Sequence, residues 1–232
     1  MWPGNVGLAM RSSHPVPELP RLSPGIQLLE APDRAIGPLQ TLVLDALMAD
    51  GGEAVWIDAH NHGTSVYLAE VAPSPRLLER VHIARGFTPY QHQSLVGDAV
   101  EAVTEATSVI VAPAIDAHYR EADVRGNEPS EMLLQSLSQL AGYAREWKIP
   151  VLMTRVATDG FSAPIEHAAR DTIEVEQTDF GPRFVGADFE TLIYHSNAQT
   201  LQTTLTYWTR ILQARQPLHE QAPYQAASPT HS

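Results

Sequence analysis

A carboxylate and two histidines lie close together at the end of a predicted buried strand. Asp58, His60 and His62 alternate along the chain there, and alternate side chains of an extended segment face the same way. Converging on one metal ion, they would activate water for a metal-dependent hydrolase or nuclease. A polar turn at the edge of a sheet explains the same residues. No fourth ligand is obvious, although Asp116 and His118 follow the neighbouring predicted strand.

A second group of side chains suits contact rather than catalysis. Residues 87–93 are rich in aromatic and amide side chains, with Phe87 and Tyr90 as the aromatic members. Such side chains stack on and hydrogen-bond to nucleic acid bases, or form the energetic centre of a protein interface. The capping of a hydrophobic core is the structural alternative.

The overall charge narrows the classes of partner. The 232 residues carry a net charge of −12, and Lys148 is the single lysine among 15 basic residues. Such a balance fits a salt-rich cytoplasm, and a genome that favours arginine codons explains it equally well. An acidic protein gains little from phosphate contacts, so autonomous nucleic-acid binding is disfavoured. No apolar run approaches the roughly 20 residues of a membrane span, and we expect a soluble, cytoplasmic protein.

Strand and helix patterns alternate along most of the chain. Hydrophobic runs predict strands over 25–30, 54–58, 108–112 and 149–154, and helical periodicity predicts helices over 38–50, 74–86 and 129–147. After residue 171 the period changes to two, which predicts antiparallel strands at 172–176, 183–185 and 191–194, followed by a closing helix over 201–214. This order predicts an α/β, three-layer fold with a mostly parallel central sheet and an antiparallel extension at the C-terminal end.

The ends of the chain differ from this central part. Residues 1–24 hold five prolines and little periodicity, which predicts an extended arm. Residues 216–232 are polar and short of large apolar side chains, which predicts a disordered tail. The folded core is therefore expected over 25–215.

The turn after the first predicted strand lies where parallel sheets usually bind phosphates. A working phosphate loop needs glycines for the backbone to wrap the phosphates, a lysine to reach them and a hydroxyl for magnesium. Here Pro32 stands at the first glycine, Gly37 at the last glycine, Pro38 at the lysine and Leu39 at the hydroxyl. Asp33 would also repel a triphosphate. The sequence therefore predicts no nucleotide and no other cofactor.

Three segments, at 55–60 with 75–85, at 109–126 and at 141–154, follow one another in a recognisable order. They resemble the ATPase core of the RecA/RadA recombinase superfamily, nearest to its archaeal RadA and RadB branch. In that order they resemble the strand and helix that follow the phosphate loop, the Walker B strand, and the helix and strand that end at Thr-Asn-Gln. The resemblance implies a RecA-like core, and the co-linear order of the segments carries it.

The catalytic positions of that family are replaced in this chain. The glutamate that activates water falls at His60, and the Walker B aspartate falls at or near Pro113, with Asp116 three residues further on. The Asn-Gln pair falls at Arg155 and Val156. Phosphoryl transfer needs lysine, metal and water positioned together, so the resemblance implies a non-catalytic paralogue.

Residues 157–170 correspond to the second DNA-contact loop of the family. Asp159 and Glu166 offset His167 and Arg170 there, so the loop is not a basic patch. The candidate residues for contact with DNA or a partner are Arg155, His167, Arg170, Phe87 and Tyr90.

The resemblance implies an accessory or regulatory factor of homologous recombination and DNA repair. Its partner would be a recombinase or another repair protein, with DNA contact inside a complex and homo-oligomer formation left open. The alternative is the metal-dependent hydrolase or nuclease built on Asp58, His60 and His62.

Overall fold

Eight strands form one sheet in the part of the chain that the structure describes. The structure is a computed structural model, and it describes residues 16–32, 35–59, 61–63, 65–121, 126–178, 181–187, 189–191 and 204–225. The strands are β1 (Gly25–Glu30), β2 (Glu53–Asp58), β3 (Val81–Arg85), β4 (Thr107–Ala112), β5 (Pro150–Met153), β6 (Asp171–Thr178), β7 (Gly181–Gly186) and β8 (Phe189–Glu190).

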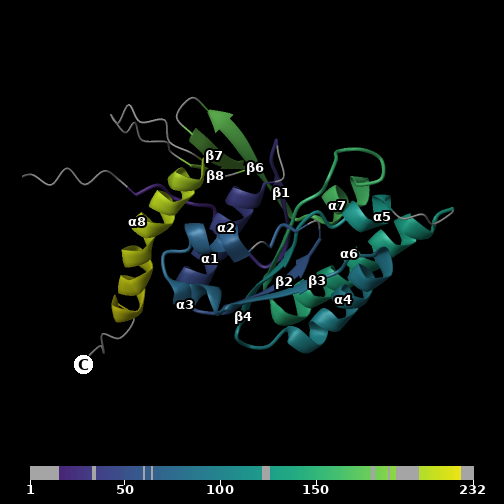
Figure 1. The fold of residues 1–232 in the computed structure, drawn as a ribbon, viewed down its shortest axis with the longest axis horizontal. Helices are drawn as coiled ribbons and strands as arrows, with labels where there is room; N and C mark the ends of the chain where they lie inside the picture. The colour runs from purple at the N-terminus through teal and green to yellow at the C-terminus, as the bar shows by residue number, and fades with distance from the viewer. Residues whose placement is uncertain are drawn as a thin grey trace, which may run out of the picture.

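The sheet is parallel over six strands and antiparallel over its last two. The spatial order is β3-β2-β4-β5-β1-β6-β7-β8. Each neighbouring pair from β3 to β6 is parallel, whereas β7 runs antiparallel to β6 and β8 antiparallel to β7. This confirms the predicted α/β class with a mostly parallel sheet and an antiparallel extension. Figure 1 shows helices on both sides of this sheet.

The central strands are buried on both faces, because alternate side chains enter different cores. In β2, Trp56 packs into one core and Val55 and Ile57 into the other. In β4, Val111 and Ile110 divide in the same way. Continuous apolar runs are typical of parallel strands that helices cover on both sides, which explains why the sequence predicted these strands.

On one face lie α1 (Ile36–Asp50), α2 (Ser65–Val71), α3 (Pro75–Leu78) and α8 (Thr204–Gln225). Helix α1 is buried nearly all round because α8 packs over it, with Trp208 of α8 fully buried. Gly51 ends α1 in the left-handed conformation at φ 72°, and its N–H donates to the carbonyl of Leu47. Residues 16–24 contain no helix or strand, and Leu19 packs into this core.

On the other face lie α4 (Pro89–Ala102), α5 (Ala117–Arg120), α6 (Glu128–Trp147) and α7 (Ala163–Ala168). Thr88 caps the start of α4 by accepting a hydrogen bond from the backbone N–H of Gln91. Helix α6 buries Leu133, Leu137 and Leu140 against the sheet, as its predicted periodicity requires. Among the described residues, no helix combines the length and the apolar character that crossing a membrane requires.

One predicted helix was wrong. Residues 74–86 form the short helix α3 and the edge strand β3, which pairs with β2. Most β3 side chains are exposed, so the segment has no alternating apolar pattern to reveal a strand. The prediction also missed α4, whose start lies inside the aromatic stretch at 87–93.

The C-terminal helix is longer than predicted. Helix α8 continues to Gln225, so the disordered tail predicted from residue 216 was wrong up to that point. Arg215 and His219 explain the extension, because both bind the buried carboxylate of Asp45 on α1. Residues 226–232 lie outside the described part, as do 192–194 of the last predicted strand, where β8 covers Phe189–Glu190.

Candidate functional site

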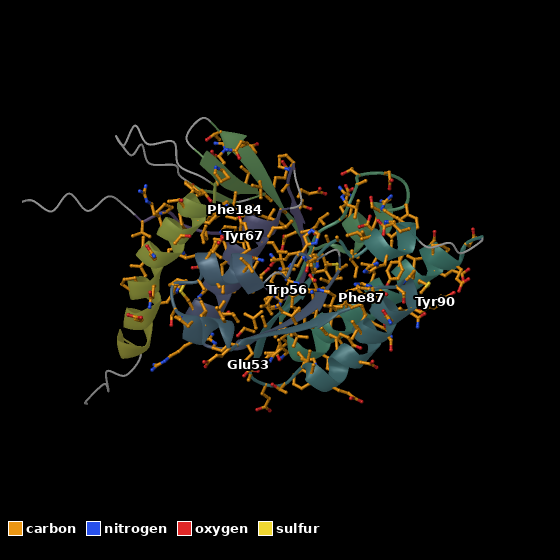
Figure 2. The ribbon with its side chains drawn as sticks, viewed as in Figure 1. Glu53, Trp56, Tyr67, Phe87, Tyr90 and Phe184 are labelled. Carbon is orange, nitrogen blue, oxygen red and sulfur yellow. The ribbon has the colours of Figure 1, made fainter. Side chains whose placement is uncertain are left out.

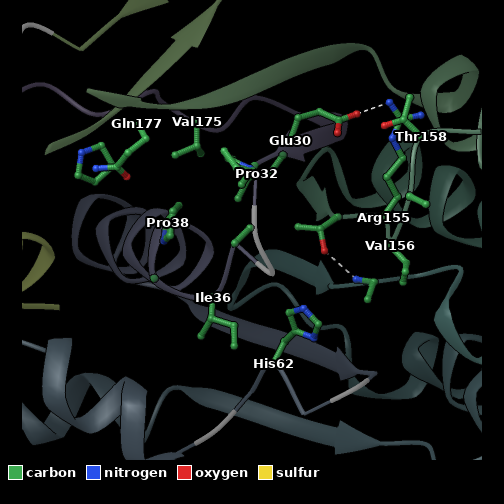
Figure 3. A pocket seen from close by; sticks show the side chains of 18 of the residues that line it. Glu30, Pro32, Ile36, Pro38, His62, Arg155, Val156, Thr158, Val175 and Gln177 are labelled. Atoms are coloured by element: carbon green, nitrogen blue, oxygen red, sulfur yellow. Dashed lines mark hydrogen bonds and ion pairs between the residues drawn. The ribbon is translucent and has the colours of Figure 1, made fainter. Parts of the chain in front are cut away.

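A cavity of about 1100 Å³ opens where the parallel strands end. The carboxyl ends of parallel strands meet at one edge of a sheet, which is the usual place for a ligand. Figure 3 shows the cavity between the start of α1, the segment after β5 and the β6–β7 hairpin. Its lining comes from Leu29, Glu30, Ala31, Pro32, Ala35, Ile36, Gly37, Pro38, His62, Tyr67, Ala114, Thr154, Arg155, Val156, Ala157, Thr158, Val175, Gln177 and Pro182.

The turn between β1 and α1 forms one wall of this cavity. Pro32 and Pro38 line it, where a phosphate loop would place a glycine and the lysine. Leu39 is fully buried in the core, so the hydroxyl position does not face the cavity. Gly37 is packed so closely that a Cβ atom there would lie 3.0 Å from the Trp208 ring. Asp33 lies outside the described residues.

Arg155 forms the opposite wall, and its charge is already neutralised. Its Nη1 donates to Glu166 at 3.1 Å and its Nη2 binds Glu30. Burial lowers the pKa of this guanidinium, but the hydrogen bonds to Glu30 and Glu166, together with the charges of these two carboxylates, raise it by more. With 7% of its side chain exposed, Arg155 belongs to the cavity wall rather than to a surface for contact.

The predicted metal ligands have other roles where the structure describes them. The fully buried carboxylate of Asp58 accepts hydrogen bonds from Gly63 N–H at 2.7 Å, Trp56 Nε1 at 3.2 Å and Arg85 Nε at 2.7 Å. His62 Nδ1 lies 2.8 Å from the carbonyl of Ala59. His60 lies outside the described residues. Within the described ranges, no three His, Asp or Glu side chains are grouped so as to hold a metal ion.

Asp116, the nearest carboxylate to the Walker B position, organises the loop after β5. It is fully buried, accepts a hydrogen bond from Val156 N–H at 2.8 Å and pairs with Arg120. Arg120 also binds Asp159 at 2.7 Å, and this hydrogen bond lowers the pKa of the Asp159 carboxyl below its usual range. The guanidinium of Arg120 lies over the ring of Phe161. These contacts fix the predicted DNA-contact loop in place, and the charges that take part in them compensate one another.

The other candidate contact residues of this loop are also bound to the protein itself. His167 is exposed, and its Nδ1 lies 2.7 Å from the carbonyl of Ala163, one turn earlier in α7. Arg170 is 67% exposed in its side chain, lies 3.7 Å from the carboxylate of Asp171 and donates to the carbonyl of Pro24. The loop therefore presents little uncompensated positive charge to a phosphate backbone.

The aromatic candidates, in contrast, lie on the surface. Phe87 is 73% exposed and Tyr90 is 57% exposed, and Figure 2 shows both on the side of the molecule that carries α4. Phe87 lies between edge strand β3 and α4, and Tyr90 lies in the first turn of α4. The hydroxyl of Tyr90 donates to Glu128, which raises the pKa of Tyr90 and fixes the ring direction.

No local sequence pattern indicates two parts of this arrangement. Gln177 and Pro182 complete the cavity from β6 and β7, far along the chain from the phosphate-loop position. A buried polar network of His92, Tyr119 and Ser136 joins α4, α5 and α6 beneath the surface. Each pair in this network is separated by many residues, so no local spacing reveals it.

Comparisons with protein-family models and with curated proteins found no match for this chain. The fold and the cavity define the class of protein: it is an α/β protein with a cavity at the carboxyl edge of its parallel strands.

Proposed function

We propose that this chain is a non-catalytic protein with a RecA/RadA-like core. It acts as an accessory factor in homologous recombination and DNA repair by binding a recombinase or another repair protein. The segments that resemble that superfamily contribute strands β2, β4 and β5, which are adjacent in one sheet. The wall that would hold a triphosphate carries prolines instead of a lysine and a hydroxyl, which supports a role without ATP chemistry.

One observation carries the proposal of a protein partner. Phe87, which follows β3, and Tyr90, in the first turn of α4, are exposed aromatic side chains, and the surface they form is here called the β3 edge surface. In the described part of the sheet β3 pairs with β2 alone, so its other side offers backbone donors and acceptors. Exposed aromatic side chains beside an open strand edge favour the addition of a strand from a partner, with the rings as anchors.

Charge supports a protein rather than DNA as the direct partner. The net charge is −12, and Arg155 and Arg120 are both engaged by carboxylates of the same chain. Free basic side chains are what a phosphate backbone requires. We therefore expect any DNA contact to arise within a complex.

The test is affinity capture of the tagged protein from its native cells at native salt, with and without nuclease, read by mass spectrometry. Phe87→Glu removes the exposed ring and adds a charge, and we expect it to reduce recovery of the repair partner by about tenfold or more. Leu218→Glu is the matched control, since Leu218 is 49% exposed on α8, across the sheet from α4. It should leave recovery unchanged.

Three results would count against this assignment. Recovery of no repair factor would refute the recombination role. Recovery that disappears with nuclease would shift the contact to nucleic acid and make the 157–170 loop the surface to study. Equal loss in both variants would show that the β3 edge surface has no special part in binding.

A further inference from the structure

The cavity at the carboxyl edge of the sheet has walls suited to a ring system. Pro32 and Pro38 line one side, Val156 lies at the rim, and Val175 and Pro182 line the side formed by β6 and β7. Proline and valine side chains contribute apolar area with little rotamer freedom. Ligand pockets are usually lined mainly by apolar side chains of this kind. The volume of about 1100 Å³ is slightly above the range of about 300–1,000 Å³ that is typical of small-molecule sites.

The charges of the cavity lining are already satisfied internally. Among the described lining residues, Glu30 and Arg155 carry the charged side chains, and they pair with each other (Figure 3). The second terminal nitrogen of Arg155 holds Glu166. Both terminal nitrogens are thus occupied, and Nε of Arg155, which has no partner, is buried. An entering anion must therefore displace a carboxylate from a guanidinium that is largely buried, and that exchange gains little.

Polar groups at the rim remain open for hydrogen bonds. The amide of Gln177 and the hydroxyl of Thr158 line the cavity and make no hydrogen bond with another described residue. They reach it from different sides, Gln177 from β6 and Thr158 from the loop after β5. A few such groups around an apolar interior fix the orientation of a ligand.

From these observations we propose that the cavity is a binding site for an uncharged small molecule that carries a ring system, and that the Glu30–Arg155 pair excludes anions from it. The rings pack against the proline and valine walls, and a neutral polar group of the ligand bonds to Gln177 or Thr158. This site is independent of the β3 edge surface and of the partner proposed above.

The test compares two probes that share one ring system and differ in charge, 2-naphthamide and 2-naphthoate, titrated against the full chain by saturation-transfer NMR. We expect the neutral amide to bind wild type about tenfold more tightly than the anion, a difference of about 1.4 kcal/mol. Glu30→Gln keeps the shape of the side chain and removes the carboxylate that pairs with one terminal nitrogen of Arg155, so it should strengthen naphthoate binding and bring the ratio close to one. Val156→Trp places bulk at the exposed rim and should weaken both probes.

Phe87→Glu is the control for non-specific stacking of the probes on the exposed aromatic residues. It should leave the affinities of both probes unchanged. Equal affinity of wild type for the two probes would overturn the proposal, as would undetectable binding of the amide at millimolar concentration. Amide binding that is lost in Phe87→Glu and kept in Val156→Trp would place the probe elsewhere and would also overturn it.

Discussion

At the scale of single residues, a buried histidine makes stability depend on pH. His92 is fully buried, and its Nδ1 lies 2.8 Å from the hydroxyl of Tyr119. The pKa of His92 is lowered to about 4, mainly by burial and also by the neighbouring His118, while Asp58 opposes the shift. The unfolded chain therefore binds a proton near pH 6.5 that the folded chain does not bind until about pH 4.

We expect the free energy of unfolding to fall as the pH drops from about 6.5 to 4, by about 3 kcal/mol from this residue. Urea denaturation across that range measures it. His92→Asn removes the titrating group, so its loss of stability over the same window should be smaller by about that amount. An identical pH dependence in the two proteins would contradict the assignment.

Two glycines differ in how closely they are packed, and we expect opposite effects on stability when each is replaced by alanine. A Cβ atom on Gly52 would lie 1.8 Å from Ser108 Oγ and 2.5 Å from the carbonyl oxygen of Ala106, whereas one on Gly142 of α6 would meet nothing within 4 Å. Gly52→Ala should therefore lower the free energy of unfolding by about 1–3 kcal/mol. Gly142→Ala should raise it by about 0.5–1 kcal/mol, because alanine loses less entropy in a helix. Chemical denaturation measures the free energy of unfolding of both variants. Changes of the same sign in that free energy would contradict the packing described.

At the scale of elements, one buried carboxylate holds α8 to α1. Arg215 binds Asp45 through two hydrogen bonds of 2.7 and 2.9 Å, and His219 binds it at 2.9 Å. Asp45→Asn leaves the guanidinium without its counter-charge in a site where 12% of its side chain is exposed. We expect a loss of about 3 kcal/mol and faster amide hydrogen exchange in α8 than in α6.

The control for α8 is a salt bridge on the surface. Arg183→Gln removes the pairs that β7 makes with Glu176 of β6 and Glu190 of β8, and we expect a change below about 1 kcal/mol. Unchanged exchange in α8 of the Asp45→Asn variant would show that apolar packing alone secures this helix.

The way in which each element is buried explains whether the sequence predicted it. Strands β2 and β4 were predicted because both of their faces are apolar. Strand β3 was missed because its side chains face solvent, and the end of α8 was missed because a charge cluster, not an apolar stripe, secures it. The prolines of the phosphate-loop position could be identified by register. The Glu30–Arg155 pair could not, because parallel neighbours in a sheet can be far apart in sequence.

At the scale of the whole molecule, two separate surfaces remain for function. The cavity lies at the carboxyl edge of the strands, and the β3 edge surface lies at one end of the sheet. Among the described residues of the cavity wall, Pro38 stands where phosphoryl transfer needs a lysine, and Leu39, at the hydroxyl position, is buried in the core. We therefore expect this chain to act by binding rather than by ATP chemistry.

The most direct test of this central claim is calorimetric titration of the purified full chain with ATP and magnesium, followed by an assay for released phosphate. We expect no saturable heat up to about 1 mM ATP and no hydrolysis above the rate without protein. A dissociation constant of about 1 mM would correspond to a binding free energy of about −4.1 kcal/mol. Micromolar binding that requires magnesium would contradict it, because the prolines at the cavity wall would then have to coexist with a working triphosphate site.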